Sequence, residues 1–239
     1  MSIWNVKVIA VSRAVLAIAA AGFFSSAGAA VSNLNLLVEH DISEVGADGV
    51  TRSMHFQERV YRRDKVVWIE RVIPAAARDV RYGHAGREHA TEEREHKHLD
   101  VAGAALWVVL EEGKVLNVRL VNAHDKAVIN IPAAEYGNVG FDGNWENTWH
   151  LLDPRQLKTM KPLTVTAPAG MRWYETATGN RTVRVLWDEK AAIPRRVMSD
   201  DKSGAARKRM TAKDIAVPRG APWALLSGYQ QKEYSDYLD

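Results

Sequence analysis

Hydrophobic and polar residues alternate with a period of two over most of the chain that follows the N-terminal segment. Val183, Val185 and Trp187 alternate with polar residues, and the same pattern recurs in several other runs. This alternation is typical of β-strands that bury one face. The run 105–110 is apolar throughout, which predicts a strand covered on both faces. The pattern therefore predicts a mainly β protein.

Short polar clusters separate these runs and have the composition of tight turns. They are 63–65, 112–114, 124–126, 178–180 and 201–204. Counting the runs between them predicts about ten or eleven short strands, joined mainly as hairpins. Consecutive hairpins build an antiparallel sheet, and curling that sheet protects its edges. The predicted fold is a partly open antiparallel barrel or curved sheet, formed by one domain over residues 31–239.

Two stretches are too long for hairpin loops, and long loops in compact domains are often lids or binding elements. The first insertion, 74–98, is rich in His and Glu, and the second, 133–162, is lid-like and carries a helix start at Asp153-Pro154. Apolar and tyrosine residues at helical spacings after Pro222 predict a C-terminal helix over 222–238.

The first 30 residues have the features of a secretory signal peptide. Lys7 and Arg13 precede an apolar run, 14–24, which is followed by small residues. The apolar run is shorter than the roughly 20 residues that a membrane-spanning helix needs. We expect cleavage after Ala29 or Ala30 and a mature protein that is periplasmic.

The amino-acid composition excludes several kinds of binding and catalytic site. The chain has no cysteine, which excludes disulfides, thiol nucleophiles and cysteine zinc sites. The net charge is +3, and part of the excess lies in the predicted signal peptide, where no acidic residue occurs. Global charge therefore gives no support to a nucleic-acid partner. The sequence also lacks the usual nucleophile-elbow, phosphate-loop, dinucleotide and zinc-protease motifs, so no catalytic residue is nominated.

Four of the eight histidines lie between His84 and His98, among glutamates. If this segment is helical, His89, Glu93 and His96 share one face, and if it begins a strand, His96 and His98 do. Imidazole and carboxylate suit divalent transition metals such as Zn, Cu or Ni. The alternative is a polar segment that keeps a long insertion solvated. A divalent transition metal is thus a candidate ligand, and no cofactor is required.

Trp145 and Trp149 lie in a loop rich in Asn, Gly and Asp, whereas most of the other tryptophans lie on strand patterns. Two rings in such a loop can line the rim of a cavity for an apolar or sugar ligand, or they can plug one end of a barrel. The basic doublets Arg62-Arg63 and Arg195-Arg196 fit the outward faces of strands.

A family resemblance rests on two stretches. The segment 60–71 (VYRRDKVVWIER) and the segment 184–197 (RVLWDEKAAIPRRV), which is followed by the turn at 201–204, resemble the LolA/LolB-type and RseB/MucB-type periplasmic half-barrels. The resemblance covers roughly 50–212 and implies an unclosed antiparallel barrel whose helices cover an apolar cavity. Lipoprotein carriage is the best-known activity of that family, but no carrier residue matches one for one.

The sequence thus favours an exported binding protein over an enzyme. The leading hypothesis is a carrier or sensor for an apolar, lipid-like ligand or a lipoprotein, with Trp145 and Trp149 at its cavity. One alternative is a periplasmic metal-handling protein that uses His89, Glu93, His96 and His98. Another is a regulatory module that docks to a membrane protein.

Overall fold

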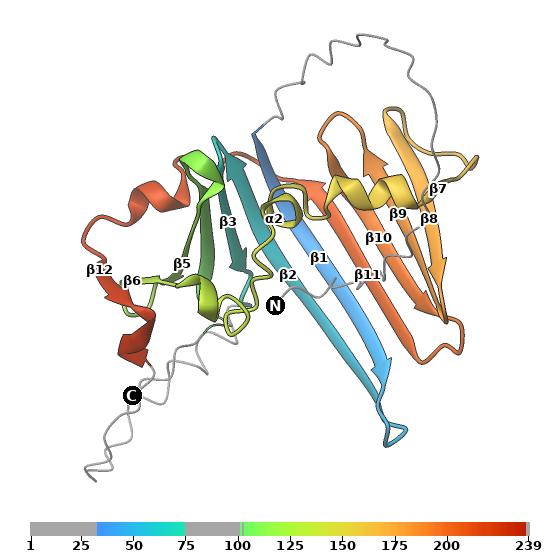
Figure 1. Ribbon diagram of the computed structural model, residues 1–239, viewed down its shortest axis with the longest axis horizontal. Helices are drawn as coiled ribbons and strands as arrows, with labels where there is room; N and C mark the ends of the chain where they lie inside the picture. Colours follow the sequence, from blue (N-terminus) through green and yellow to red (C-terminus); the bar gives the residue numbers. More distant parts are fainter. Residues whose placement is uncertain (1–32, 75–100, 102, 238–239) are drawn as a thin grey trace, which may run out of the picture.

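The computed structural model describes residues 33–74, 101 and 103–237, which form a single curved sheet of twelve strands (Figure 1). The predicted signal peptide lies outside the described residues. The order across the sheet is β12-β6-β5-β4-β3-β2-β1-β11-β10-β9-β8-β7. The strands are β1 (Leu34–Val45), β2 (Thr51–Arg63), β3 (Val66–Arg71), β4 (Ala105–Leu110), β5 (Leu116–Asn122), β6 (Ala127–Asn130), β7 (Lys161–Pro162), β8 (Met171–Thr178), β9 (Arg181–Asp188), β10 (Ile193–Asp201), β11 (Ala206–Asp214) and β12 (Gln230–Glu233).

Every neighbouring pair of strands is antiparallel except β12 with β6, which is parallel. The sheet does not close, so the prediction of an open antiparallel sheet is confirmed. Most neighbours are hairpins, as the polar clusters predicted. The β2–β3 turn places Asp64 and Lys65 at positive φ, 48° and 64°. Such a turn matches the right-handed twist of the two strands that it joins.

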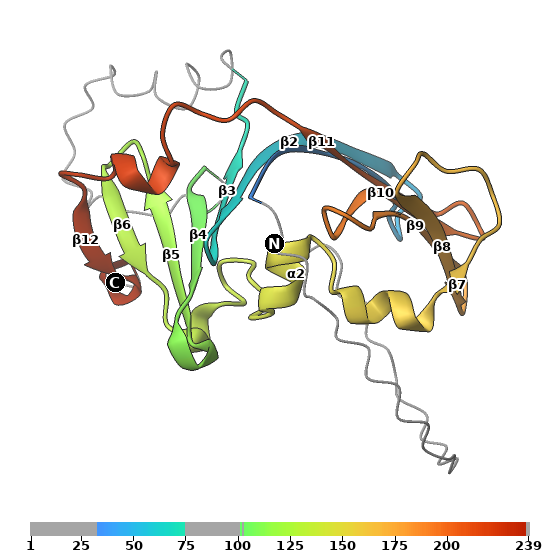
Figure 2. The same cartoon turned by 90° about the horizontal axis from the view of Figure 1, so that it is seen from above.

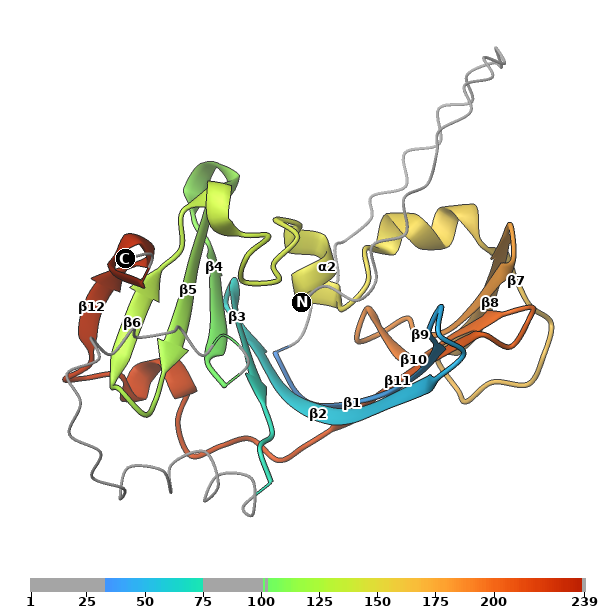
Figure 3. The same ribbon diagram turned by 90° about the horizontal axis from the view of Figure 1, so that it is seen from below.

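The sheet is strongly bent, with one concave and one convex face (Figures 2 and 3). The second predicted insertion, residues 133–162, crosses the concave face and connects β6 to β7 at opposite ends of the sheet. We call this segment the lid. It contains η3 (Ala133–Glu135), α2 (Trp145–His150) and η4 (Pro154–Thr159), followed by β7; a further 3-10 turn, η2 (Glu112–Lys114), joins β4 to β5.

The main core lies between the lid and the concave face. On β1, Leu36 and Val38 point toward the lid and are each 2% exposed, whereas the residues between and beside them point to the convex face. Val185 of β9 and Ile193 of β10 are fully buried in the same cluster. The period of two that the sequence shows is therefore the alternation between this core and the convex surface.

A second layer covers part of the convex face. The chain after β11 runs back over the sheet to reach β12 and packs Trp223, Leu226 and Tyr229 against Tyr61 and Trp68 (Figure 2). The apolar run 105–110 lies beneath both layers, since Val108 belongs to a concave cluster and Ala105 to this convex one. The expectation that this strand is covered on both faces agrees with the structure.

The expected C-terminal helix over 222–238 is wrong. Residues 222–237 form η5 (Pro222–Leu225), then β12, then η6 (Tyr234–Tyr237). Gly228 lies between them at φ 84°, a left-handed conformation that interrupts a right-handed helix. The backbone N–H of Gln230 donates to the carbonyl of Lys126 at 2.8 Å, which starts the pairing with β6. Pairing with a sheet edge has overridden the helical spacing of the apolar residues.

Candidate functional site

The lid is built around the short helix α2. The side chain of Asn144 caps it by accepting hydrogen bonds from the backbone N–H groups of Glu146 and Asn147. The amide of Asn147 donates to Asp142 at 2.7 Å and accepts from the backbone N–H of Asp153 at 2.8 Å, so it joins the chain before the helix to the chain after it. The helix ends at Leu151, which has a left-handed φ of 61°. These contacts fix the direction in which α2 presents its side chains.

Trp145 and Trp149 lie one turn apart on α2 and therefore on the same side of the helix. Their rings stack with centroids 5.1 Å apart and an interplanar angle of 27°. Both rings are partly buried and pack on the main core, and Trp145 also contacts the second concave cluster, which includes Val108 and Phe141. The two rings thus rest on the apolar concave face, where we expected a cavity rim.

Arg62 fastens the lid to the sheet. It projects from the end of β2 and is only 3% exposed. Its Nη1 donates to the carbonyl of Trp149 at 2.6 Å, and its Nη2 donates to the carbonyl of Ala191 at 3.0 Å. Its Cζ also lies 4.8 Å from the centre of the Trp149 ring. One guanidinium therefore holds the lid and the β9–β10 turn together.

This arrangement corrects the expectation that Arg62-Arg63 lies on an outward strand face. Arg62 pairs with Val67 across the β2–β3 ladder and shares the concave side with it, while Arg63 is partly exposed. The available signal was strand parity, since Arg62 is two residues beyond the buried Val60 and must point the same way. Sequence reasoning assigned the doublet by its charge instead.

Burial changes the electrostatics of Arg62. Removal from water lowers the pKa of its guanidinium to about 10, so the group remains charged at neutral pH. A buried cation is costly unless hydrogen bonds satisfy it. The carbonyl of Ala191 belongs to the sheet, whereas the carbonyl of Trp149 provides its bond only while the lid is seated. The free energy of the buried guanidinium therefore depends on whether the lid is seated.

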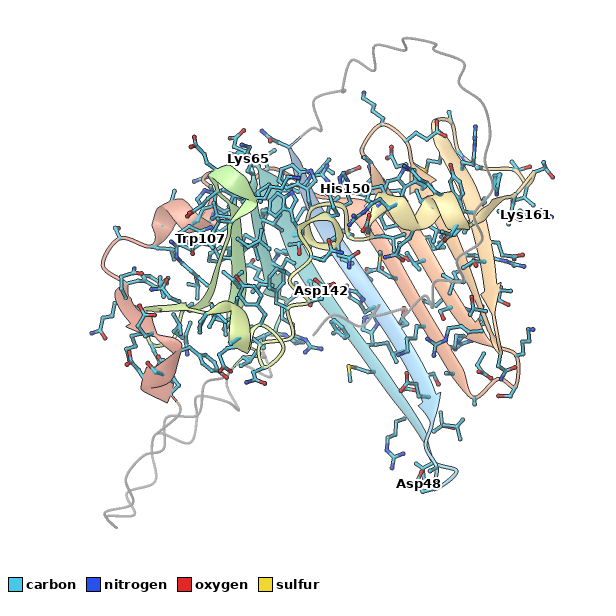
Figure 4. The ribbon with its side chains drawn as sticks, in the orientation of Figure 1. Asp48, Lys65, Trp107, Asp142, His150 and Lys161 are labelled. Atoms are coloured by element: carbon cyan, nitrogen blue, oxygen red, sulfur yellow. The ribbon has the colours of Figure 1, made fainter. Side chains whose placement is uncertain are left out.

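His150, the last residue of α2 (Figure 4), makes a second connection to the same turn. Its Nδ1 donates to the carbonyl of Ala192 at 2.6 Å, and its Nε2 lies 3.5 Å from a carboxylate oxygen of Glu146. Burial lowers the pKa of the imidazole, and the positive charge of Arg62 lowers it further, against the opposing effects of the Ala192 carbonyl and Glu146. The neutral imidazole is thus favoured beside the guanidinium.

The β9–β10 turn is held rigidly enough to receive both groups. Asp188 at its base accepts hydrogen bonds from the backbone N–H groups of Lys190 and Ala191 and from Nε of Arg195. Burial opposes ionisation of Asp188, but these donors outweigh it and keep the pKa of the carboxyl below its ordinary value. Ala192 adopts a positive φ of 52°. The carbonyl of Ala191 accepts from Arg62 of β2, and the next carbonyl, that of Ala192, accepts from His150 of the lid.

Beyond the lid, the concave face continues toward the tip of the β1–β2 hairpin. There Phe56 stacks on His40 with ring centroids 4.5 Å apart, and the guanidinium carbon of Arg71 lies 4.1 Å from the centre of the Phe56 ring. Met54 is 50% exposed on the same face. The concave surface thus changes from a covered apolar core to an open surface of mixed character.

Two hollows on the surface of the described residues are lined by residues outside the lid. An open groove of about 490 Å³ runs beside β5 and is lined by residues that include Glu111, Arg119 and Glu233. A narrow cleft lies on the convex side between Tyr61 and Trp223. The concave face under the lid is occupied by the side chains of the lid itself.

The predicted metal ligands His89, Glu93, His96 and His98 lie outside the described residues. Within residues 33–74, 101 and 103–237, no group of three or more His, Asp or Glu side chains is arranged to hold a metal ion. A search of the same residues finds no helix that is both long enough and apolar enough to span a membrane.

No family model and no curated protein matches the chain. Among solved structures, it is similar to a LolA superfamily protein from Nitrosomonas europaea, with 9% identity, a TM-score of 0.32 and coverage of 83% of this chain and 91% of that one. It is also similar to MucB, with 11% identity, a TM-score of 0.40 and coverage of 85% of this chain and 60% of that one.

A third similar structure is a domain described as an outer membrane lipoprotein-sorting protein, from Vibrio parahaemolyticus. It is 10% identical, has a TM-score of 0.33, and the match covers 81% of this chain and 89% of that one. The resemblance expected from the sequence is thus found among known structures. Likeness at this level concerns the fold and carries no argument about what this chain binds.

Proposed function

We propose that this protein is exported to the periplasm and there binds an apolar, lipid-like ligand between the lid and the concave face, as a carrier or sensor. The observation that carries the proposal is the pair of hydrogen bonds by which Arg62 joins Trp149 of the lid to Ala191 of the sheet. We call this contact the latch. The buried charge of Arg62 fastens the apolar lid to an apolar surface, and it does so through a backbone carbonyl of the lid rather than through a carboxylate.

The lid fits the role of an exchangeable cover. Trp145, Trp149 and Leu157 contribute apolar surface that packs on the sheet without belonging to any strand. An acyl chain of similar apolar area can replace these contacts at little net cost, because the hydrophobic effect depends on area and not on identity. The hydrogen bonds made by Arg62 and His150 then determine the rate at which the lid dissociates from the sheet.

This mechanism assigns a role to each site residue. The sheet supplies the binding surface, Trp145 and Trp149 occupy it when the ligand is absent, and Arg62 holds the covered state. Ligand entry breaks the bond from Arg62 to Trp149 while the bond to Ala191 remains, and the guanidinium then becomes accessible to water or to a polar headgroup. No covalent step is involved.

The test is ligand binding by the mature protein, with an apolar fluorescent dye as the probe and a lysophospholipid as the competitor. We expect the dye to bind and the competitor to displace it, with a change in tryptophan emission that is lost in Trp149→Phe combined with Trp145→Phe. Arg62→Gln should exchange the dye faster, since it removes the latch.

Arg63→Gln is the matched control, because it removes the neighbouring charge and leaves the latch intact. Equal exchange rates in the two variants would contradict the role of Arg62. If no dye binds to the native protein or to Arg62→Gln, the ligand-binding proposal itself is wrong.

A further inference from the structure

Within the described part of the chain, strand β2 has an edge in the middle of the sheet that is unpaired over part of its length, and we call this stretch the free edge. It pairs with β1 along its whole length, from Thr51 opposite Val45 to Arg62 opposite Leu34. On its other side, the ladder with β3 ends where Glu58 faces Arg71, with one further bond from the N–H of Val72 to Gln57. Among the described residues, nothing pairs with this side of β2 from Thr51 to Phe56, and the hairpin projects past the end of β3 (Figure 1).

The direction of the backbone groups along this edge follows from the ladder. The carbonyl of Gln57 points to the β3 side, because it accepts from Val72 at 2.8 Å. Backbone groups alternate sides along a strand, so the N–H and C=O groups of Thr51, Ser53 and His55 point to the same side. This edge therefore offers an ordered row of donors and acceptors.

The edge differs from the two outer edges of the sheet. β7 is two residues long and contains Pro162, and β12 has four residues that are all polar or charged. Short strands, proline and charge are the usual protection against unwanted pairing. The edge of β2 has neither proline nor a register shift, and residues 51–55 are all exposed, with Met54 at 50%. An accessible, regular edge of this kind is a template for an added strand.

A second copy of this chain fits the edge poorly. Two β2 strands related by a two-fold axis run antiparallel, so each hairpin tip points toward the β3 strand of the other copy. The tip around Asp48 (Figure 4) of each copy would then lie against the end of β3 in the other copy, where the free edge stops at Gln57. A single extended segment has no such tip and can run along the whole edge.

The charged side chains beside the free edge of β2 indicate which side chains an added strand would have. Glu58 contacts His40 at 3.2 Å, and His55 contacts Asp41 at 2.7 Å. Arg71 forms no ion pair within the described part of the chain, and its guanidinium leans over the Phe56 ring toward the free edge. An acidic side chain at the start of an incoming strand would meet this guanidinium, and an apolar one further along would cover Met54.

We propose that the free edge of β2, Thr51–Phe56, is the docking site for an extended segment of a partner protein. The segment adds as a strand antiparallel to β2, in line with β3, and places an acidic residue beside Arg71. This site is separate from the ligand site under the lid and does not depend on it.

The test selects linear peptides from a displayed random library on the mature protein and measures their affinity for variants. Ser53→Pro removes an N–H that points outward while leaving the β1 ladder intact, because proline is tolerated where the N–H does not serve the sheet. Ser53→Thr is the matched control and keeps the N–H. We expect selected peptides to bind about tenfold or more weakly to Ser53→Pro and unchanged to Ser53→Thr.

Arg71→Gln should weaken only those peptides that carry an acidic residue near the N-terminal end of the paired stretch. Amide exchange supplies a second readout, in which binding should protect the N–H groups of Thr51, Ser53 and His55. Peptides that bind Ser53→Pro as tightly as the native protein would overturn the proposal. So would a dimer in light scattering that Ser53→Pro dissociates, because the edge would then serve a second copy.

Discussion

The two ends of the concave face are made by the same strands and use charge in opposite ways. Under the lid, β1 contributes Leu36 and Val38, and the charge of Arg62 is buried and bonded to backbone carbonyls. Near the hairpin tip, β1 contributes Ile42 and Glu44, and Glu44 pairs with Lys208 at 2.6 Å in a partly exposed ion pair. The buried charge of Arg62 connects the lid to the sheet. The exposed ion pair contributes little to the free energy of unfolding, because solvent screens it.

The largest expected difference between the two ends is in packing. Leu152 of the lid is 5% exposed in the main core, and Leu152→Ala should lower the free energy of unfolding by about 3 kcal/mol through the cavity that it leaves. Met54→Ala at the open end should cost about 0.5 kcal/mol or less, since that side chain is largely in water. Urea unfolding of both variants measures the difference, and equal costs would mean that the lid does not pack as described.

The next effect tests the buried charge. Arg62→Ala leaves the carbonyls of Trp149 and Ala191 without this donor and should cost about 2–3 kcal/mol of unfolding free energy. Arg63→Ala should cost about 0.5 kcal/mol or less, since its side chain is partly exposed. Similar urea midpoints for the two variants would mean that Arg62 stabilises the fold no more than a partly exposed arginine does.

A smaller effect is expected from pH. The pKa of His150 is lowered in the folded state, chiefly by burial, so below the ordinary histidine value the unfolded chain binds more protons than the folded one. Stability should therefore fall as the pH drops below about 6.5. Urea midpoints across this range should flatten in His150→Asn and keep their slope in His124→Asn, which changes an exposed histidine. A slope unaffected by His150→Asn would contradict the assignment.

The smallest effect is expected at the exposed ion pair. Lys208→Gln should change the unfolding free energy by less than about 1 kcal/mol, and added salt should shrink even that difference. The same salt titration should leave the cost of Arg62→Ala nearly unchanged, because the buried guanidinium is shielded from ions. Equal salt dependence in the two variants would contradict the distinction between a buried charge at the lid and an exposed ion pair near the hairpin tip.

The strands and turns were predictable because each depends on short-range signals. Alternation around Val185 and the turn residues Asp64 and Lys65 are local properties, and the structure follows them. The lid was predicted as an excursion by its length. Its two tryptophans were singled out as the rim of a ligand cavity, and that role stays a prediction.

The parts that could not be predicted depend on contacts between distant residues. Arg62 was misassigned because its partners, Trp149 and Ala191, lie far along the chain and are backbone carbonyls, which leave no trace in side-chain composition. The C-terminal segment had the spacing of a helix, but the free edge of β6 accepted it as a strand. The roles of His150 and Asp188 likewise follow only from the fold.

The central position of β1 has a consequence for how the chain acquires its structure. β1 lies between β2 and β11, and its ladder with β11 pairs Leu36 with Asp214, which stand near opposite ends of the chain. The middle of the sheet can therefore assemble only after nearly the whole polypeptide is available, and non-local pairing of this kind slows folding. Until β11 has been made, β1 has only one of its two neighbours, so the N-terminal strands alone cannot complete the middle of the sheet.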